Sequence, residues 1–205
     1  MEPTYERTPQ PTSSPWGAVD HAKEYAPGIW SVSTSSHGGF RLSDARNAAV
    51  PDYWRAADGW YEEDCMWAVV CAVWPEAFTE TWRQQADVSL RNWQPDGYEA
   101  FYGVVLKAGE SHKKDERAFW LQHADDYIAR SAFGDQWEWV PQGFVGVCAG
   151  RGRREPCGSP VEERWFLVPE PEYRTGPFGL VINRERHAEI EKPANRHVRR
   201  QRVAA

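Results

Sequence analysis

The chain has 205 residues, a formal net charge of −6 and 41% hydrophobic residues, a length and composition that suit one globular domain with a substantial core. No apolar run approaches the roughly 18 residues of a membrane span, and the N-terminal segment lacks the apolar core of a signal peptide. We therefore expect a cytoplasmic protein with no membrane contact. The surplus of acidic residues also argues against general nucleic-acid binding, which depends on neutralising phosphates.

The charge is distributed unevenly along the chain. From Asn183 onward seven Arg or Lys residues stand against three Glu residues, a net charge of +4, which leaves −10 for the first 182 residues. We expect 191–205 to be a basic, disordered tail that contacts nucleic acid or an acidic partner only weakly. Residues 1–15 are rich in Pro, Thr and Ser and are expected to form a disordered arm. A single domain would then occupy 16–190.

Tryptophan is the unusual component of this sequence, with 12 residues. Most of them must pack inside, because so many exposed indoles would make an adhesive surface. Some could line a pocket or a partner interface, where tryptophan is enriched. The four cysteines form neither a C-x-x-C motif nor paired His/Cys spacing, so we expect them to be reduced thiols that hold no metal. They are Cys65, Cys71, Cys148 and Cys157.

The N-terminal part of the domain predicts a β-hairpin. A strand-like segment at 20–25 leads into a turn at 26–28, which contains Pro and Gly, and residues 29–33 then alternate apolar and polar side chains. A short strand is expected at 40–42, and Ser43 or Asp44 can cap a short helix that follows it.

Residues 59–74 carry the strongest amphipathic pattern of the chain. A buried helical face is indicated by the i, i+3, i+4, i+7 spacing of Trp67, Val70, Cys71 and Trp74. Three acids precede that face and would occupy the first turn of the helix, where carboxylates interact with unpaired backbone N–H groups. Alternatively, at least one of them faces a cleft as a general base, a metal ligand or an electrostatic contact. These acids are Glu62, Glu63 and Asp64.

The middle of the chain predicts further helices and its last part predicts strands. The expected helices are 75–93, with Trp82 on its apolar face, 98–102 and 111–125. The expected strands are 127–132, 143–149, 164–168 and 178–182. The predicted fold class is therefore α+β, with an N-terminal β-hairpin, a helical middle and C-terminal, mainly antiparallel strands.

His37 is the most interesting single residue for function. The glycines that follow it let the backbone approach a ligand or adopt positive φ, so Gly38, Gly39 and the nearby Arg41 are candidate ligand-binding residues. His37 could form a His–carboxylate pair with Glu62, Glu63 or Asp64, for acid–base catalysis or anion binding. The alternative is that the glycines only make a turn and His37 bonds locally. Cys65 would be the nucleophile beside these acids, although adjacent carboxylates disfavour a thiolate.

A second candidate ligand site is the basic loop at 151–158. Arg151 and Arg153, together with Arg154, could bind a phosphate, because the guanidinium group offers a planar fork that matches it. A solvated hairpin loop is the alternative interpretation.

Six motifs of this sequence carry a resemblance to a known family, namely S-T-S-S-H-G-G-F-R-L-S, G-W-Y-E-E-D-C-M-W-A, P-E-A-F, G-F-V-G-V-C-A, F-L-V-P and P-F-G-L-V-I. Together they resemble an uncharacterised family of small domains from alphaproteobacterial chromosomes, plasmids and phages. The resemblance would span 16–190 and implies a bacterial or mobile-element setting, with no established activity.

Two functions of different classes remain open. The first is a non-enzymatic interaction protein that binds a host or mobile-element protein. It is favoured by the lack of a complete catalytic signature, by the acidic, aromatic-rich body and by the basic tail. It predicts a contiguous exposed aromatic or acidic patch with no deep polar pocket. The second is a hydrolase or transferase, which predicts that His37 and one of the acids converge within a few ångströms at one cleft. The sequence indicates no class of cofactor.

Overall fold

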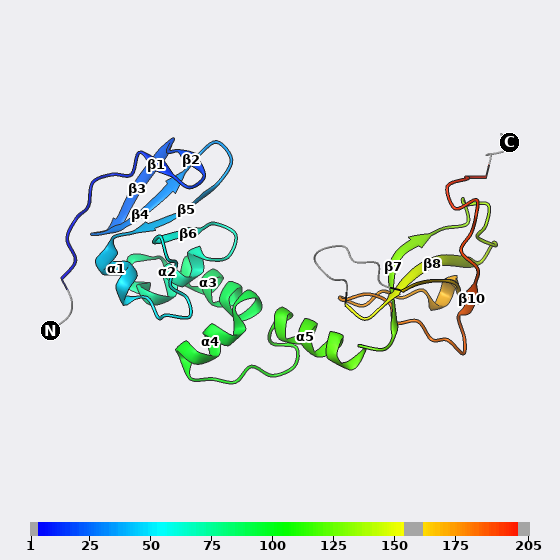
Figure 1. The fold of residues 1–205 in the computed structure, drawn as a ribbon. Helices are drawn as coiled ribbons and strands as arrows, with labels where there is room; N and C mark the ends of the chain where they lie inside the picture. The colour runs from blue at the N-terminus through cyan, green and yellow to red at the C-terminus, as the bar shows by residue number, and fades with distance from the viewer. Residues whose placement is uncertain (1–3, 154–161, 201–205) are drawn as a thin grey trace. The chain divides into compact units, whose positions relative to one another are not determined.

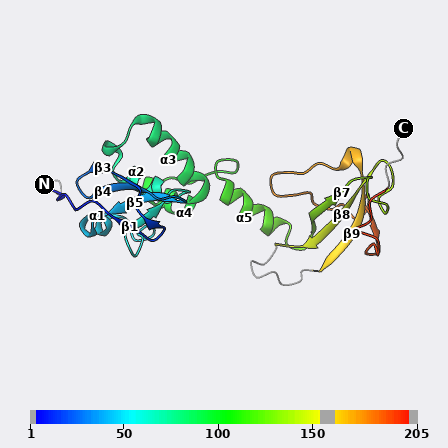
Figure 2. The ribbon, with the colours of Figure 1, turned by 90° about the horizontal axis from the view of Figure 1, so that it is seen from above.

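The computed structural model describes residues 4–153 and 162–200, in which the chain divides into two compact units, Met1–Asp115 (unit 1) and Glu116–Ala205 (unit 2). Figure 1 and Figure 2 trace the chain from blue at its beginning to red at its end. We expected a single domain over 16–190, but each unit has a four-stranded sheet and a hydrophobic cluster of its own. Within the described residues, no helix combines the length and the apolar character needed to cross a membrane.

The sheet of unit 1 is antiparallel and contains the predicted hairpin. Its strands lie side by side in the order β3 (His21–Ala26), β4 (Ile29–Ser33), β5 (Gly38–Leu42) and β6 (Trp60–Glu62) (Figure 1). The hairpin of β3 and β4 is confirmed, and β5 includes the short strand expected at 40–42. A separate two-stranded ribbon precedes this sheet and consists of β1 (Ser13–Ser14) and β2 (Gly17–Ala18).

The described part of the N-terminal segment, which we expected to be disordered, packs against the rest of unit 1. The ring of Tyr5 stands 3.7 Å from Cζ of Arg46, which is only 5% exposed. Thr8 accepts a hydrogen bond from the indole of Trp30 at 3.1 Å. The segment therefore covers a buried guanidinium and a sheet tryptophan, contacts that its Pro- and Thr-rich composition alone does not reveal.

The helical middle of the chain is confirmed. Ser43 caps the first helix, because its Oγ accepts a hydrogen bond from the backbone N of Arg46 at 3.2 Å. The helices are α1 (Asp44–Ala49), α2 (Trp67–Val73), α3 (Glu80–Trp93), α4 (Pro95–Tyr102) and α5 (His112–Gln122), with a 3-10 turn η1 (Pro75–Ala77) before α3.

The placement of the three acids in the first turn of a helix was wrong. Glu62 ends strand β6, which pairs with β5 through Gly39. α2 begins only at Trp67 and has no acidic residue in its first turn. The predicted helical face is nevertheless buried at Val70, Cys71 and Trp74. Residues 60–62 form a strand because the neighbouring edge of β5 can pair with them, a long-range effect that helical periodicity does not reveal.

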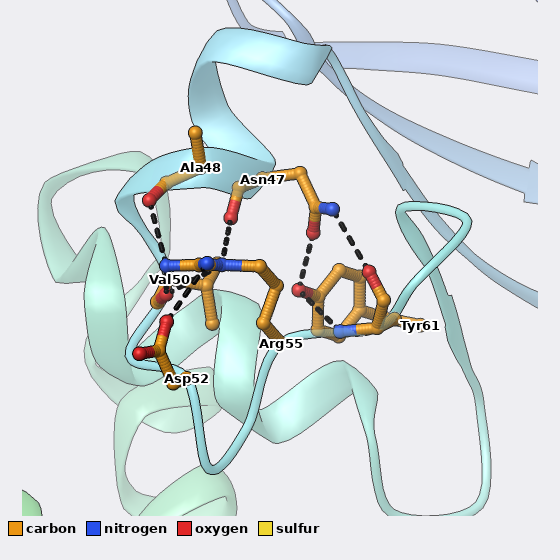
Figure 3. Close-up of polar contacts among 7 residues, drawn as sticks. Asn47, Ala48, Val50, Asp52, Arg55 and Tyr61 are labelled. Carbon is orange, nitrogen blue, oxygen red and sulfur yellow. Dashed lines mark hydrogen bonds and ion pairs between the residues drawn. The ribbon is translucent and has the colours of Figure 1, made fainter.

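Tyr61 belongs to the hydrophobic cluster of unit 1, with its side chain completely buried. Its hydroxyl donates a hydrogen bond to Oδ1 of Asn47 at 2.7 Å and accepts one from the backbone N of Ala56 at 3.2 Å (Figure 3). The amide of Asn47 donates in turn to the carbonyl of Ala56 at 2.8 Å. The buried hydroxyl is thus fully paired, and it fixes the loop between α1 and β6.

Arg55 closes the same loop against the end of α1 (Figure 3). Its Nε donates to the carbonyls of Asn47 and Val50 at 3.1 and 3.0 Å, and its Nη2 donates to Ala48 and Val50 at 2.9 and 2.7 Å. The last carbonyls of a helix have no partner within the helix, so one guanidinium satisfies the end of α1. Asp52 pairs with Nη1 at 2.8 Å and holds the guanidinium in place.

Unit 2 contains the second antiparallel sheet. Its strands lie in the order β10 (Ala188–Ile190), β9 (Glu163–Pro169), β8 (Phe144–Arg151) and β7 (Tyr127–Phe133), and a 3-10 turn, η2 (Glu170–Glu172), follows β9. Three of the four predicted strands are present, and their antiparallel pairing is confirmed. Together with unit 1, this arrangement confirms the α+β class.

The predicted strand at 178–182 was wrong. Only an isolated bridge joins Val181 to Ile128, supported by hydrogen bonds from Ala129 N to Leu180 O at 2.9 Å and from Ile182 N to Tyr127 O at 2.8 Å. The register of β7 shifts just after Ala129, and such a bulge bends a strand and limits further pairing. The fourth strand of the sheet is β10 instead.

The described part of the basic tail packs within unit 2, where we expected disorder. Arg199 lies 4.9 Å from the ring of Trp137 and forms an isolated bridge with it. Arg200 donates from Nη2 to the carbonyl of Val140 at 2.9 Å. These two arginines therefore interact with their own unit, and residues 201–205 lie outside the described chain.

We predict that Tyr61→Phe lowers the free energy of unfolding by about 1–3 kcal/mol, because the buried Oδ1 of Asn47 and N–H of Ala56 lose their shared partner. Urea unfolding followed by circular dichroism measures the change. The matched control is Tyr53→Phe, since Tyr53 is 52% exposed, and it should change stability by no more than about 0.5 kcal/mol. Equal stabilities of the two variants would contradict the role of the Tyr61 hydroxyl.

Candidate functional site

A pocket of about 280 Å3 opens in unit 1 where the sheet meets α2 and α3. Phe40 of β5 lines it on the sheet side, Trp67 and Trp82 line it on the helical side, and Glu63 reaches it from the turn between β6 and α2. The pocket is lined by Ser31, Val32, Ser33, Gly38, Gly39, Phe40, Glu63, Trp67, Trp82 and Gln85.

Two tryptophans form the aromatic wall of the pocket. Trp67 is the first residue of α2 and Trp82 lies in the first turn of α3, and their rings meet edge to face with centroids 5.3 Å apart. The rings of Phe40 and Trp82 also meet edge to face, with centroids 6.3 Å apart. Both indoles are partly buried against the hydrophobic cluster of unit 1, so the core fixes them while part of each ring faces the pocket.

Glu63 is positioned by the start of β5. Its backbone N donates to the carbonyl of Gly38 at 3.1 Å, and its side chain is 52% exposed. A Cβ at Gly38 would lie 2.7 Å from Oε2 of Glu63, so the carboxylate occupies the space that this glycine leaves free. The absence of a side chain at Gly38 therefore places a negative charge on the pocket.

Gly39 serves the opposite face of the same strand. A Cβ there would lie 2.3 Å from the carbonyl oxygen of Tyr61 on the neighbouring strand and 2.5 Å from the ring of Trp16. These two close approaches leave no room for a side chain and require glycine at this position.

His37 lies beside Glu63, with 3.9 Å between His37 Nδ1 and Glu63 Oε1. Its backbone is held by a tight turn in which Thr34 Oγ1 accepts from His37 N at 3.1 Å and Thr34 N donates to His37 O at 2.8 Å. The imidazole itself is 61% exposed. The structure thus brings His37 and one of the three candidate acids together in contact with solvent, and of the two only Glu63 lines the pocket.

The other two candidate acids do not line the pocket. Oε1 of Glu62 accepts a hydrogen bond from the backbone N of Asp64 at 2.8 Å, which closes the turn after β6. Among the described residues, no cluster of three or more His, Cys, Asp or Glu side chains could hold a metal ion. Glu62 therefore serves the local turn, and Asp64 stays exposed beside it.

The cysteine next to these acids is a poor nucleophile. Burial first, and then the charges of Glu62 and Asp64, raise the pKa of the Cys65 thiol, while a hydrogen bond from Gln94 opposes the shift. Burial also raises the pKa of the buried Cys71 to about 11. Thiols of this kind remain protonated and unreactive near neutral pH. Cys157 lies outside the described residues.

Arg41 serves the sheet rather than the pocket. Its Nη1 donates to the carbonyl of Asp58 at 2.9 Å, and its Nη2 pairs with Asp44 at 3.5 Å. Its Cζ also lies 5.6 Å from the ring of Trp60. Because neighbouring residues of a strand point to opposite faces, Arg41 lies on the far side of β5 from Phe40.

The candidate arginines of the basic loop belong to unit 2. Arg151 pairs with Asp125 at 2.9 Å and Arg153 pairs with Glu116 at 3.8 Å. Arg154 lies outside the described residues. Both described guanidinium groups therefore have carboxylate partners within their own unit.

A second depression, the α3 groove, adjoins the pocket along helix α3. It has a volume of about 490 Å3 and shares Gln85 with the pocket. Val88 and Trp93 in this groove are each 48% exposed. The α3 groove is lined by Thr81, Gln84, Gln85, Val88, Ser89 and Trp93.

The sequence did not single out Trp67, Trp82 or Gln85 as site residues. Periodicity assigned the two tryptophans to buried helical faces, and this is correct for only part of each ring. The available signal was the number of tryptophans, 12 in the chain, because tryptophan is highly buried on average but rarely buried completely. Which of them reach the surface depends on how α2 and α3 pack on the sheet.

The sequence profile of the family described as Domain of unknown function (DUF7007) matches residues 9–124. The matched segment includes every residue of the pocket and the α3 groove, and it ends close to the boundary between the two units. No curated protein matches the chain, and no solved structure matches it.

We predict that Cys71 and Cys148 resist alkylation by iodoacetamide at pH 8 in the folded protein. Burial raises the pKa of each thiol to about 11, so on the order of one thiol in a thousand is ionised at that pH. Mass spectrometry of the labelled cysteines gives each rate, and unfolding in urea is the control that should release both thiols. Labelling of either one at the unfolded rate would contradict its burial.

Proposed function

We propose that this chain, which belongs to the family described as Domain of unknown function (DUF7007), is a non-enzymatic binding protein that contacts a partner protein through the pocket and the α3 groove. The observation that carries this proposal is that the two depressions share a lining residue, Gln85 of α3. Together they present aromatic, aliphatic and amide groups along one helix. Aromatic residues are enriched at protein interfaces.

The size of the pocket supports recognition of a side chain. Its volume of about 280 Å3 falls just below the roughly 300–1,000 Å3 of typical small-molecule and cofactor sites. A single large side chain of a partner would fill it. The α3 groove would then take neighbouring residues of the same partner, and Val88 and Trp93 supply apolar surface there.

The setting suggested by the family resemblance agrees with this proposal. A host or mobile-element protein of a bacterial cytoplasm is the partner class that we favour. The acidic composition of the chain also makes a protein partner more suitable than general contact with nucleic acid.

A second candidate function is acid–base catalysis by a hydrolase or transferase. It is favoured by the 3.9 Å between His37 Nδ1 and Glu63 Oε1, a distance that a bound substrate could shorten. The exposure of both side chains weighs against it, because acid–base sites usually gain strength from excluding water. Binding without chemistry is the simpler use of an exposed pair.

The proposal is tested by selecting binders from a phage-displayed peptide library on the purified full chain. We expect enriched peptides whose affinity, measured by fluorescence polarisation, falls at least about tenfold in Gln85→Trp, because a bulky ring fills the junction of the pocket and the α3 groove. The matched control is Gln122→Trp, the same change at an exposed position of α5 that lines neither depression.

Selected peptides that bind Gln85→Trp as tightly as the wild type would refute this contact surface, as would a selection that enriches nothing over the bare support. His37→Ala separates the two candidate functions. A binding protein should keep peptide affinity within about twofold in this variant, since His37 lines neither depression. Turnover of a selected peptide that stops in His37→Ala would favour the enzyme instead.

A further inference from the structure

We infer that the pocket receives the guanidinium group of an arginine in a basic segment of the partner protein. This inference rests on the binding function proposed above and specifies its partner. It is carried by the juxtaposition of one carboxylate, Glu63, with the partly exposed rings of Trp67 and Trp82 in a space sized for one side chain.

The chemistry of the lining favours a cation. Aromatic rings attract a positive charge through their quadrupole, and tryptophan does so most strongly. Glu63 is the only charged side chain among the lining residues in the described part of the chain. A cation that enters can therefore contact both indoles and pair with the carboxylate, and no basic lining residue opposes it.

Arginine fits this lining better than lysine. Its planar guanidinium stacks on an aromatic face and also donates two parallel hydrogen bonds to a carboxylate. The serines of β4 add neutral polar groups, because Ser31 and Ser33 line the pocket from the sheet side. An ammonium group is more strongly hydrated than a guanidinium and loses more on leaving water.

Unit 1 already holds its own arginines in comparable surroundings. Arg46 is buried between Tyr5 and Trp74, with Cζ 3.7 and 5.0 Å from the two ring centroids, and Glu76 attracts its charge. Arg41 lies over Trp60 beside Asp44. The pocket presents the same combination of indole and carboxylate, but its lining includes no arginine.

The charge of unit 1 complements a basic partner. Its sequence contains 17 acidic and 10 basic residues, a net charge of −7. Such a field raises the rate at which an oppositely charged segment arrives. We therefore assign the partner segment a positive net charge in addition to its arginine.

The α3 groove sets the length of the partner segment. Trp82 and Trp93 are eleven residues apart in one helix, a separation of about 16 Å along its axis at roughly 1.5 Å per residue. An extended chain covers that distance with about five residues at roughly 3.3 Å each. The arginine would enter the pocket near Trp82, and an apolar side chain would reach Val88 and Trp93.

The test is a titration of the 15N-labelled full chain with N-acetylarginine amide, followed through the indole N–H signals of its tryptophans. Trp67→Phe and Trp82→Phe variants assign the two pocket signals. We expect these two signals to shift in a saturable way. The indole signal of Trp54, which is buried elsewhere in the hydrophobic cluster of unit 1, should not shift and serves as the internal reference. N-acetylcitrulline amide, the neutral isostere, should bind at least about tenfold more weakly.

Matched charge variants complete the test. Glu63→Gln should weaken binding of the arginine probe about tenfold. The control Asp64→Asn removes the same charge from an exposed neighbour that does not line the pocket, and it should change binding less than twofold. The inference is overturned if the pocket signals do not shift, if citrulline matches arginine, or if Glu63→Gln binds like the wild type.

The peptide selection distinguishes this failure from failure of the proposed function. Enriched peptides that need an open Gln85 junction but share no arginine would leave the binding function standing and refute the arginine. A selection that enriches no peptide would refute the binding function itself.

Discussion

The buried hydroxyl of Tyr61 is the constraint on which the rest of unit 1 depends. A phenol with no exposure must have partners for its O–H, and Asn47 and Ala56 supply them. This requirement fixes the loop after α1 and sets β6 against β5. Because β6 ends beside Gly38, the next residue, Glu63, can bond the backbone there and carry its carboxylate over the glycine. The pocket thus follows from a core hydrogen bond rather than from any catalytic motif.

The parts of the fold that local signals specify could be predicted from sequence. Alternation and a Pro-Gly turn indicated the hairpin of β3 and β4, and Ser43 capped α1 as expected. Strand β6 could not be predicted, because residues 60–62 form a strand only by pairing with the edge of β5. For the same reason the apolar run at 178–182 suggested a strand, although the bend in β7 after Ala129 allows it only a bridge.

The candidate site was predictable only in its polar half. The sequence indicated His37 because two glycines follow it, and Glu63 because it is one of three adjacent acids in an aromatic stretch. The structure places His37 Nδ1 3.9 Å from Glu63 Oε1. The aromatic half was not predictable, since periodicity places Trp67 and Trp82 on a buried face without showing that each ring also reaches a pocket. Surface exposure of a core residue depends on how helices meet the sheet, and no local pattern contains that information.

The central claim is that Gly38, which has no side chain, lets Glu63 and the two tryptophans form one cation-binding pocket. A titration of Gly38→Ala with N-acetylarginine amide tests this claim most directly. A methyl group there would lie 2.7 Å from the carboxylate and 3.1 Å from the carbonyl of Val32, so Glu63 must move away. We predict that the variant stays folded, by circular dichroism, and loses arginine binding as fully as Glu63→Gln does. Binding of wild-type strength in folded Gly38→Ala would contradict the claim.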